Sequence, residues 1–145
     1  MHYTLGRWEL EGDIRRRLEE GVHVVVDRYA YSGSAFSAAK PGLDLAWCKQ
    51  QDTGLPKPDL VIFLDVNEEV ASKRGGFGEE RYETLEFQRA VRINYHLMMD
   101  PSWVEVNADG TEEEVACRLQ ELVDAEVDKD HGELGLLWMI TSEDA

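Results

Sequence analysis

The stretch 22–37 constrains the fold of this chain more than any other part of the sequence. It opens with Val22-His23-Val24-Val25-Val26, in which four of the five residues are valine, and continues with small, polar and aromatic residues. A short apolar run between Gly21 and a charged pair is typical of a strand that is buried on both faces of a parallel sheet. We therefore predict a strand over 22–26, followed by the start of a helix over 30–40 that lines a pocket.

Asp27 and Arg28 directly follow the predicted strand. In open α/β sheets the carboxyl ends of the strands face the ligand crevice, and an acid at that place often faces the metal of a bound nucleotide. An arginine beside the acid offers a planar fork of donors to phosphate oxygens. The pattern therefore predicts a phosphate site, although a strand-end ion pair without chemistry fits it about equally well.

Helical patterns and apolar runs alternate along the rest of the chain. The helical patterns cover 4–20, 43–51, 84–99 and the segment that opens with the capping box of Thr111 and Glu114, and the apolar runs cover 60–65 and 103–107. This alternation predicts an α/β fold with a parallel sheet flanked by helices, in a single domain over 1–145. The apolar segment 136–140 is either docked on this domain or a contact between subunits.

Spacing within the helices predicts which side chains are buried. In the helix over 84–99 we expect Phe87, Val91, Leu97 and Met98 near one buried face. The arginines at 15–17 end the first helix, where cations interact favourably with the helix dipole, so we expect them to face solvent or a partner.

Composition excludes some functions. The chain has 145 residues, of which 43% are hydrophobic, and a formal net charge of −15, which argues against binding to nucleic acid or to an anionic membrane. No apolar run is long enough for a membrane span, and the first residues lack the features of a signal peptide, so we expect a soluble, intracellular protein. Cys48 and Cys117 lack metal or redox spacing, and we interpret both as reduced packing residues.

The segment 73–83 is rich in glycine and basic residues. Three of the four residues at 75–78 are glycine, and arginines flank them. Because glycine loosens the backbone and arginine binds anions, this composition predicts a mobile lid that closes over an anion. On composition alone, a solvated glycine-rich loop is an equally good interpretation.

Four motifs occur in a fixed order along the chain. They are Asp27-Arg28-Tyr29-Ala30-Tyr31-Ser32-Gly33-Ser34-Ala35-Phe36, Leu45-Ala46-Trp47-Cys48-Lys49-Gln50, Gly54-Leu55-Pro56-Lys57-Pro58-Asp59-Leu60 and Lys73-Arg74-Gly75-Gly76-Phe77-Gly78-Glu79-Glu80-Arg81-Tyr82-Glu83. An ordered set is far more specific than any single motif. Together they resemble the eukaryotic thymidylate kinases, and the resemblance runs from about Tyr3 to Trp138.

The resemblance implies a P-loop nucleoside monophosphate kinase fold and transfer of the γ-phosphoryl group of ATP to thymidine monophosphate (dTMP). The product, dTDP, would serve dTTP synthesis. The family resemblance also implies Mg²⁺ as the cofactor and a homodimer. We expect a cytoplasmic location, with the nucleus or the mitochondrion as an additional one.

The resemblance further assigns catalytic and ATP-binding residues. Arg28 matches the arginine that holds the acceptor phosphate, and Asp27 matches the acid close to the metal, which it would reach through water. The other implied residues are Arg74 and Arg81 in the lid over ATP, and Asn107, Ala108 and Asp109 near adenine.

For the dTMP pocket, the resemblance implies that Tyr3 stacks on the thymine base and that Arg7 contacts the base. The remaining residues that it implies around dTMP are Arg28, Ser32, Gly33, Phe36, Ser37, Tyr82 and Gln88.

The sequence also departs from the family pattern. The phosphate-binding loop, Gly-x-x-x-x-Gly-Lys-Ser/Thr, does not occur in it, and neither does the N-terminal strand that leads into that loop. We therefore expect these 145 residues alone to have negligible kinase activity and a damaged sheet. Either the chain is an incomplete thymidylate kinase, which we favour, or it is a non-catalytic relative that binds nucleotide or pairs with a full-length subunit.

Overall fold

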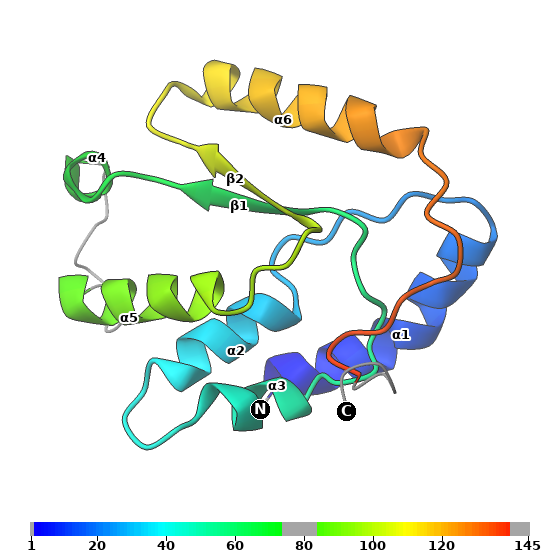
Figure 1. Ribbon diagram of the computed structural model, residues 1–145, viewed down its shortest axis with the longest axis horizontal. Coiled ribbons are helices and arrows are strands. Elements are labelled where there is room, and N and C mark those ends of the chain that lie inside the picture. Colours follow the sequence, from blue (N-terminus) through cyan, green and yellow to red (C-terminus); the bar gives the residue numbers. More distant parts are fainter. Residues whose placement is uncertain (1, 74–83, 140–145) are drawn as a thin grey trace. The chain divides into compact units, whose positions relative to one another are not determined.

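The computed structural model of the chain describes residues 2–73 and 84–139, and for residues 2, 3, 72 and 73 it describes the backbone only. The chain divides into two compact units, one formed by 1–57, 89–98 and 133–145 and the other by 58–88 and 99–132. The elements are α1 (His2–Glu19), α2 (Ala30–Ala38), α3 (Leu45–Gln50), β1 (Val61–Asp65), α4 (Glu68–Lys73), α5 (Leu85–His96), β2 (Trp103–Asn107) and α6 (Glu112–Val127) (Figure 1).

The first unit contains helices α1, α2 and α3 and most of α5. Helix α2 contacts both α1 and α3 (Figure 1). Gly21 follows α1 and has φ 74°. Glycine adopts this left-handed conformation without a steric penalty, so it suits the end of a helix. Asp44 caps α3, since its side chain accepts a hydrogen bond from the backbone N–H of Trp47 at 3.0 Å. The predicted helices at 4–20, 30–40 and 43–51 are thus confirmed with small shifts at their ends.

Helix α2 has one buried face and one half-buried face. Ala30, Tyr31, Ser34 and Ala35 are buried, and at helical spacing they share one side. The opposite side carries residues that are only half-buried, namely Ser32, Gly33, Phe36 and Ser37. The four α2 residues that the sequence assigned to a nucleoside pocket therefore lie away from the packed side of the helix.

The predicted strand over 22–26 is wrong. These residues form no strand, and the side chains of Val22, Val25 and Val26 are 42%, 92% and 47% exposed. A valine run becomes a buried strand only where neighbouring strands supply hydrogen bonds and side-chain contacts. Neither β1 nor β2 pairs with it, so Asp27 and Arg28 lie in a bend before α2 rather than at a strand end.

The segment 135–138, which we call the C-terminal strap, is docked on the first unit. The backbone N–H of Gly54 donates to the carbonyl of Leu137 at 2.9 Å, and the N–H of Leu137 donates to the carbonyl of Leu55 at 2.8 Å. Both leucine side chains are almost fully buried. The interpretation of this segment as a docked piece is confirmed.

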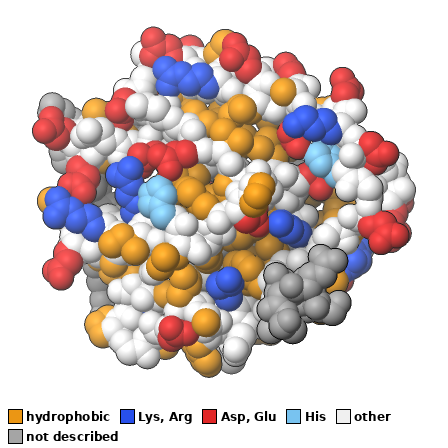
Figure 2. Space-filling view, in the orientation of Figure 1, with side chains coloured by type: hydrophobic (Ala, Val, Ile, Leu, Met, Phe, Trp, Pro, Cys, Tyr) orange, Lys and Arg blue, Asp and Glu red, His pale blue; other side chains and the backbone are white. Residues whose placement is uncertain are grey.

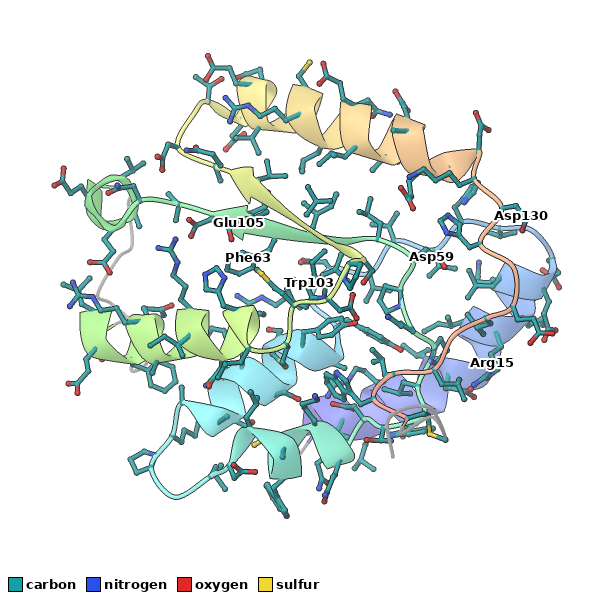
Figure 3. All side chains as sticks on the ribbon, viewed as in Figure 1. Arg15, Asp59, Phe63, Trp103, Glu105 and Asp130 are labelled. Atoms are coloured by element: carbon teal, nitrogen blue, oxygen red, sulfur yellow. The ribbon has the colours of Figure 1, made fainter. Side chains whose placement is uncertain are left out.

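The second unit contains a two-stranded parallel sheet. Strands β1 and β2 pair from Val61 opposite Trp103 to Asp65 opposite Asn107. Phe63 lies two residues after Val61 on the same face of β1, and Val61 is paired with Trp103. Phe63 and Trp103 therefore share one face of the sheet, where their ring centroids lie 6.4 Å apart (Figure 3). The predicted strands at 60–65 and 103–107 and their parallel arrangement are confirmed.

Helix α6 packs against β2. Its N-terminus has the predicted capping box, in which the side chains of Thr111 and Glu114 each accept a hydrogen bond from the other's backbone N–H. Acidic side chains gather over this helix at the top of Figure 2. Cys117, also on α6, is exposed, so its interpretation as a packing residue is wrong, whereas Cys48 on α3 is buried.

Helix α5 only partly follows its predicted face. Val91 and Met98 are buried as predicted, but Leu97 is 68% exposed. The helix ends at His96, so the helical period no longer determines where Leu97 points. Within 2–73 and 84–139, no helix is long and apolar enough to cross a membrane.

Adjacent leucines in the C-terminal strap test its contribution to stability. We expect Leu137→Ala to lower the free energy of unfolding by about 2–5 kcal/mol, because it leaves a cavity at a fully buried site. Leu136→Ala is the matched control, since Leu136 is 38% exposed and the expected loss is at most about 1 kcal/mol. Urea unfolding of both variants measures the difference, and equal losses would show that the strap is not anchored by Leu137.

Candidate functional site

Arg7 and Arg28 both reach the half-buried side of α2. A Cβ atom added at Gly33 would lie 3.1 Å from Nη2 of Arg7, so the guanidinium of Arg7 is seated where this glycine lacks a side chain. The guanidinium carbon of Arg28 lies 5.8 Å from the ring centroid of Phe36, within the range of a cation–π contact. Gly33 and Phe36 are three residues apart and share one helix face.

Arg7 is held by a buried acid. Its Nε and Nη2 atoms donate to the two carboxylate oxygens of Asp52 at 3.0 and 2.6 Å, and Nη2 also donates to Oγ1 of Thr4 at 3.3 Å. The Arg7 side chain is 13% exposed and that of Asp52 is 2% exposed. The positive charge of Arg7 is therefore matched inside the protein.

Arg28 differs from Arg7 in charge balance and in backbone. Its side chain is exposed, and among the described residues no acid forms an ion pair with it. Its backbone has φ 61°, in the left-handed region that residues other than glycine rarely adopt. Such conformations persist where the surrounding structure imposes them, and they cluster at functional sites. Arg28 thus offers a positive charge that an anion could neutralise.

The structure brings together only part of the predicted site. Arg7, Arg28, Gly33 and Phe36 lie in the first unit in the contacts given above, and Asp27 is exposed in the same bend as Arg28. Tyr3 belongs to α1, but its side chain is outside the described part of the structure. The predicted lid residues Arg74 and Arg81, and Tyr82 beside them, also lie outside the described residues.

The remaining predicted residues belong to the second unit. Gln88 lies in α5 and is half-buried. The turn after β2 uses its polar atoms locally: Asp109 accepts from the backbone N–H of Asn67 at 2.7 Å and donates its own N–H to Oδ1 of Asn107 at 2.8 Å. Ala108 is 6% exposed, and its N–H donates to the carbonyl of Asp65 at 2.7 Å.

Sequence reasoning missed two polar side chains beside Arg7. One is Asp52, which lies 45 positions from Arg7, so no local spacing connects them. The other is Tyr29, whose hydroxyl donates to the carbonyl of Pro56 at 3.2 Å. Burial, reinforced by the negative charge of Asp52, raises the pKa of Tyr29 from 10.0 to about 12.

The described side chains could bind a magnesium ion only together with the phosphates of a bound nucleotide. Within 2–73 and 84–139, no three His, Cys, Asp or Glu side chains gather into a metal site. Asp27 is a single exposed carboxylate. Because Mg²⁺ commonly keeps several waters and binds through one or two carboxylates together with substrate phosphates, Asp27 fits that role when a nucleotide is present.

Known proteins share this fold. The solved structure of thymidylate kinase from Candida albicans matches with a TM-score of 0.79 and 31% sequence identity, over 92% of this chain and 69% of that one. This match and the parallel pairing of β1 and β2 show that the chain has the fold of the P-loop nucleoside monophosphate kinases.

Sequence comparison narrows the class. A family model described as thymidylate kinase matches residues 1–118. The thymidylate kinase of Danio rerio is 50% identical over 123 residues, which are 83% of this chain and 58% of the relative. That of Homo sapiens is 44% identical over 139 residues, which are 91% of this chain and 66% of the relative. The chain belongs to the thymidylate kinase family, and it spans between about half and two thirds of the length of these relatives.

The raised pKa of Tyr29 predicts how the stability of the chain depends on pH. The unfolded chain releases the phenol proton near pH 10.0 and the folded chain near 12, so unfolding releases a proton between these values and stability falls there. Below pH 10 this contribution is fully retained. We expect denaturant unfolding to report a loss of stability between pH 10 and 12 that is smaller in Tyr29→Phe. Identical pH profiles for the two proteins would contradict the raised pKa.

The close approach of Arg7 to Gly33 predicts the effect of adding a side chain at this position. At the dTMP pocket that the family resemblance predicts, we expect Gly33→Ala to weaken dTMP binding, because the added Cβ would lie 3.1 Å from Nη2 of Arg7 and displace the guanidinium. Stability should change by less than about 1 kcal/mol, since alanine favours the helix while the contact is crowded. Gly12→Ala, in α1 with nothing within 4 Å, is the control that should leave binding unchanged. Calorimetric titration measures the dTMP affinity of both variants. Equal affinities would show that a Cβ atom at residue 33 does not displace Arg7.

Proposed function

We propose that this chain carries the dTMP-binding part of a thymidylate kinase, which transfers the γ-phosphoryl group of ATP to dTMP. The observation that supports this most directly is the pair of guanidinium groups on one side of α2. Arg7 is neutralised by Asp52 and contacts the helix at Gly33, whereas Arg28 has no acidic ion-pair partner among the described residues and lies over Phe36. A nucleoside monophosphate has a neutral base at one end and an anionic phosphate at the other, and these two arginines match that distribution of charge.

The proposed roles follow from charge and shape. Arg28 would hold the acceptor phosphate through charge-assisted hydrogen bonds. Arg7, Gly33 and Phe36 would line the base and sugar, together with the half-buried Ser32 and Ser37 and with Tyr3, Tyr82 and Gln88. Phosphoryl transfer depends mainly on positioning and on neutralising charge, so a fixed acceptor site is its first requirement.

The ATP side of the proposal rests on family membership. Arg74 and Arg81 in the lid would contact ATP phosphates, and the turn of Asn107, Ala108 and Asp109 would lie near adenine. Mg²⁺ would neutralise phosphate charge during transfer, with Asp27 contacting its water shell. By the same reasoning we propose that the chain is a single domain and acts in the cytoplasm as a homodimer.

The proposed function predicts the effect of removing the Arg28 side chain. Arg28→Gly suits the left-handed backbone, so it removes the guanidinium without adding strain. We expect dTMP affinity to fall by roughly tenfold to a hundredfold, the loss of a charge-assisted contact worth about 2 kcal/mol, while the affinity for thymidine stays the same.

Arg16→Ala is the matched control, because Arg16 is exposed on α1 and pairs with Asp13 and Glu20. Calorimetric titration with dTMP and thymidine measures binding. Turnover with ATP and Mg²⁺ is compared between the chain and a version that carries a strand and a phosphate-binding loop ahead of residue 1. Undiminished dTMP binding by Arg28→Gly would refute the acceptor site.

A further inference from the structure

Asp52 is a buried acid in the turn that follows α3. It is 1% exposed, and both of its carboxylate oxygens accept hydrogen bonds from Arg7, a residue of α1. A buried carboxylate is costly unless its charge is matched and its oxygens are hydrogen-bonded. The bond to Arg7 meets both conditions.

The ion pair leaves one defined part of Arg7 available. A guanidinium has five N–H groups, of which Nε carries one and each Nη carries two. Nε and Nη2 are used by Asp52 and Thr4. The two N–H groups of Nη1 therefore remain for a ligand as far as the described residues are concerned, and a Cβ at Gly33 would lie 3.5 Å from this atom. A planar fork held through two parallel bonds cannot turn without breaking them.

The turn that carries Asp52 is itself held on two sides. The indole Nε1 of Trp8, one residue after Arg7, donates to the carbonyl of Gln51 at 3.0 Å. On the other side the C-terminal strap accepts from Gly54 and donates to Leu55 through the backbone of Leu137. The backbone on both sides of Asp52 is thus held by contacts that do not involve the Arg7 side chain, which lets Asp52 act as the reference point for the arginine.

We propose that Asp52 is a positioning residue that sets the base specificity of this site. It aims Nη1 of Arg7 at a carbonyl of the pyrimidine base, and it cancels the arginine's charge so that a neutral acceptor is preferred there to a phosphate. This inference rests on the proposed function, because it concerns the base end of the dTMP site.

The chemistry of the bases makes the inference specific. Thymine carries two ring carbonyls, whereas cytosine has an amino group in place of one of them. An arginine offers donors only, so an amino group opposite it would place donor against donor. A fixed Nη1 therefore favours a base with carbonyl acceptors, and a mobile one loses part of that preference.

Asp52→Asn tests the role of the acid. Asparagine keeps the shape but replaces one acceptor with a donor and leaves the charge of Arg7 unmatched. We expect the dissociation constant for dTMP to rise about tenfold or more, and that for dCMP to rise less, so that the dTMP-over-dCMP preference falls. Asp13→Asn is the control, because it removes two exposed arginine–carboxylate pairs, to Arg16 and Arg17, from α1 and should leave both constants unchanged.

Exchanging the two residues of the ion pair separates the effect of Asp52 on the position of the guanidinium from its effect on folding. Arg7→Asp alone leaves buried acids unpaired, and Arg7→Asp with Asp52→Arg restores the ion pair but moves the guanidinium to the other backbone. We expect the double variant to regain melting temperature over Arg7→Asp without regaining dTMP affinity.

Each outcome of these titrations is decisive. Recovery of dTMP affinity together with melting temperature would mean that the pair is only structural, and would overturn the inference. An unchanged dTMP-over-dCMP preference in Asp52→Asn would overturn it as well, while leaving the proposed function in place. Failure of the wild-type chain to bind dTMP would overturn the proposed function and this inference with it.

Discussion

The first unit depends on the buried ion pair between Arg7 and Asp52. An acidic side chain that is only 2% exposed is tolerated because a guanidinium meets its carboxylate with two parallel hydrogen bonds. That requirement brings α1 to the turn after α3, where Trp8 adds a hydrogen bond to the backbone of Gln51. The C-terminal strap then closes over the same turn, so its contacts are tied to the place of one buried charge.

Two arginines that contact one side of α2 differ in charge balance because their surroundings differ. Burial and an acid partner leave Arg7 with hydrogen-bonding capacity but little net charge to offer, whereas Arg28 is exposed and keeps its charge. The backbone at Arg28 adopts a left-handed conformation, which re-aims the chain into α2 and brings the guanidinium over Phe36. In the proposed site, this difference in charge would separate the neutral end of a ligand from its anionic end.

The second unit relies on backbone and turn chemistry rather than on buried charge. Its parallel ladder ends at Asp65 and Asn107, and the following turn is closed by hydrogen bonds among Asn67, Asn107 and Asp109. The side chains of Asn107 and Asp109 each accept from a backbone N–H in this turn, in place of a backbone partner. The turn is therefore defined by local bonds before any ligand is considered.

Local patterns in the sequence determined most helices, both strands and the capping box at Thr111, because these depend on residues a few positions apart. The same reasoning failed for the valines at 22–26, since a strand also requires a partner that local pattern does not reveal. The family resemblance identified Arg7, Arg28 and the α2 residues as candidates. Only the tertiary structure decided that Asp52 neutralises Arg7, because a contact across 45 positions depends on how helices pack and leaves no periodic signal in the chain.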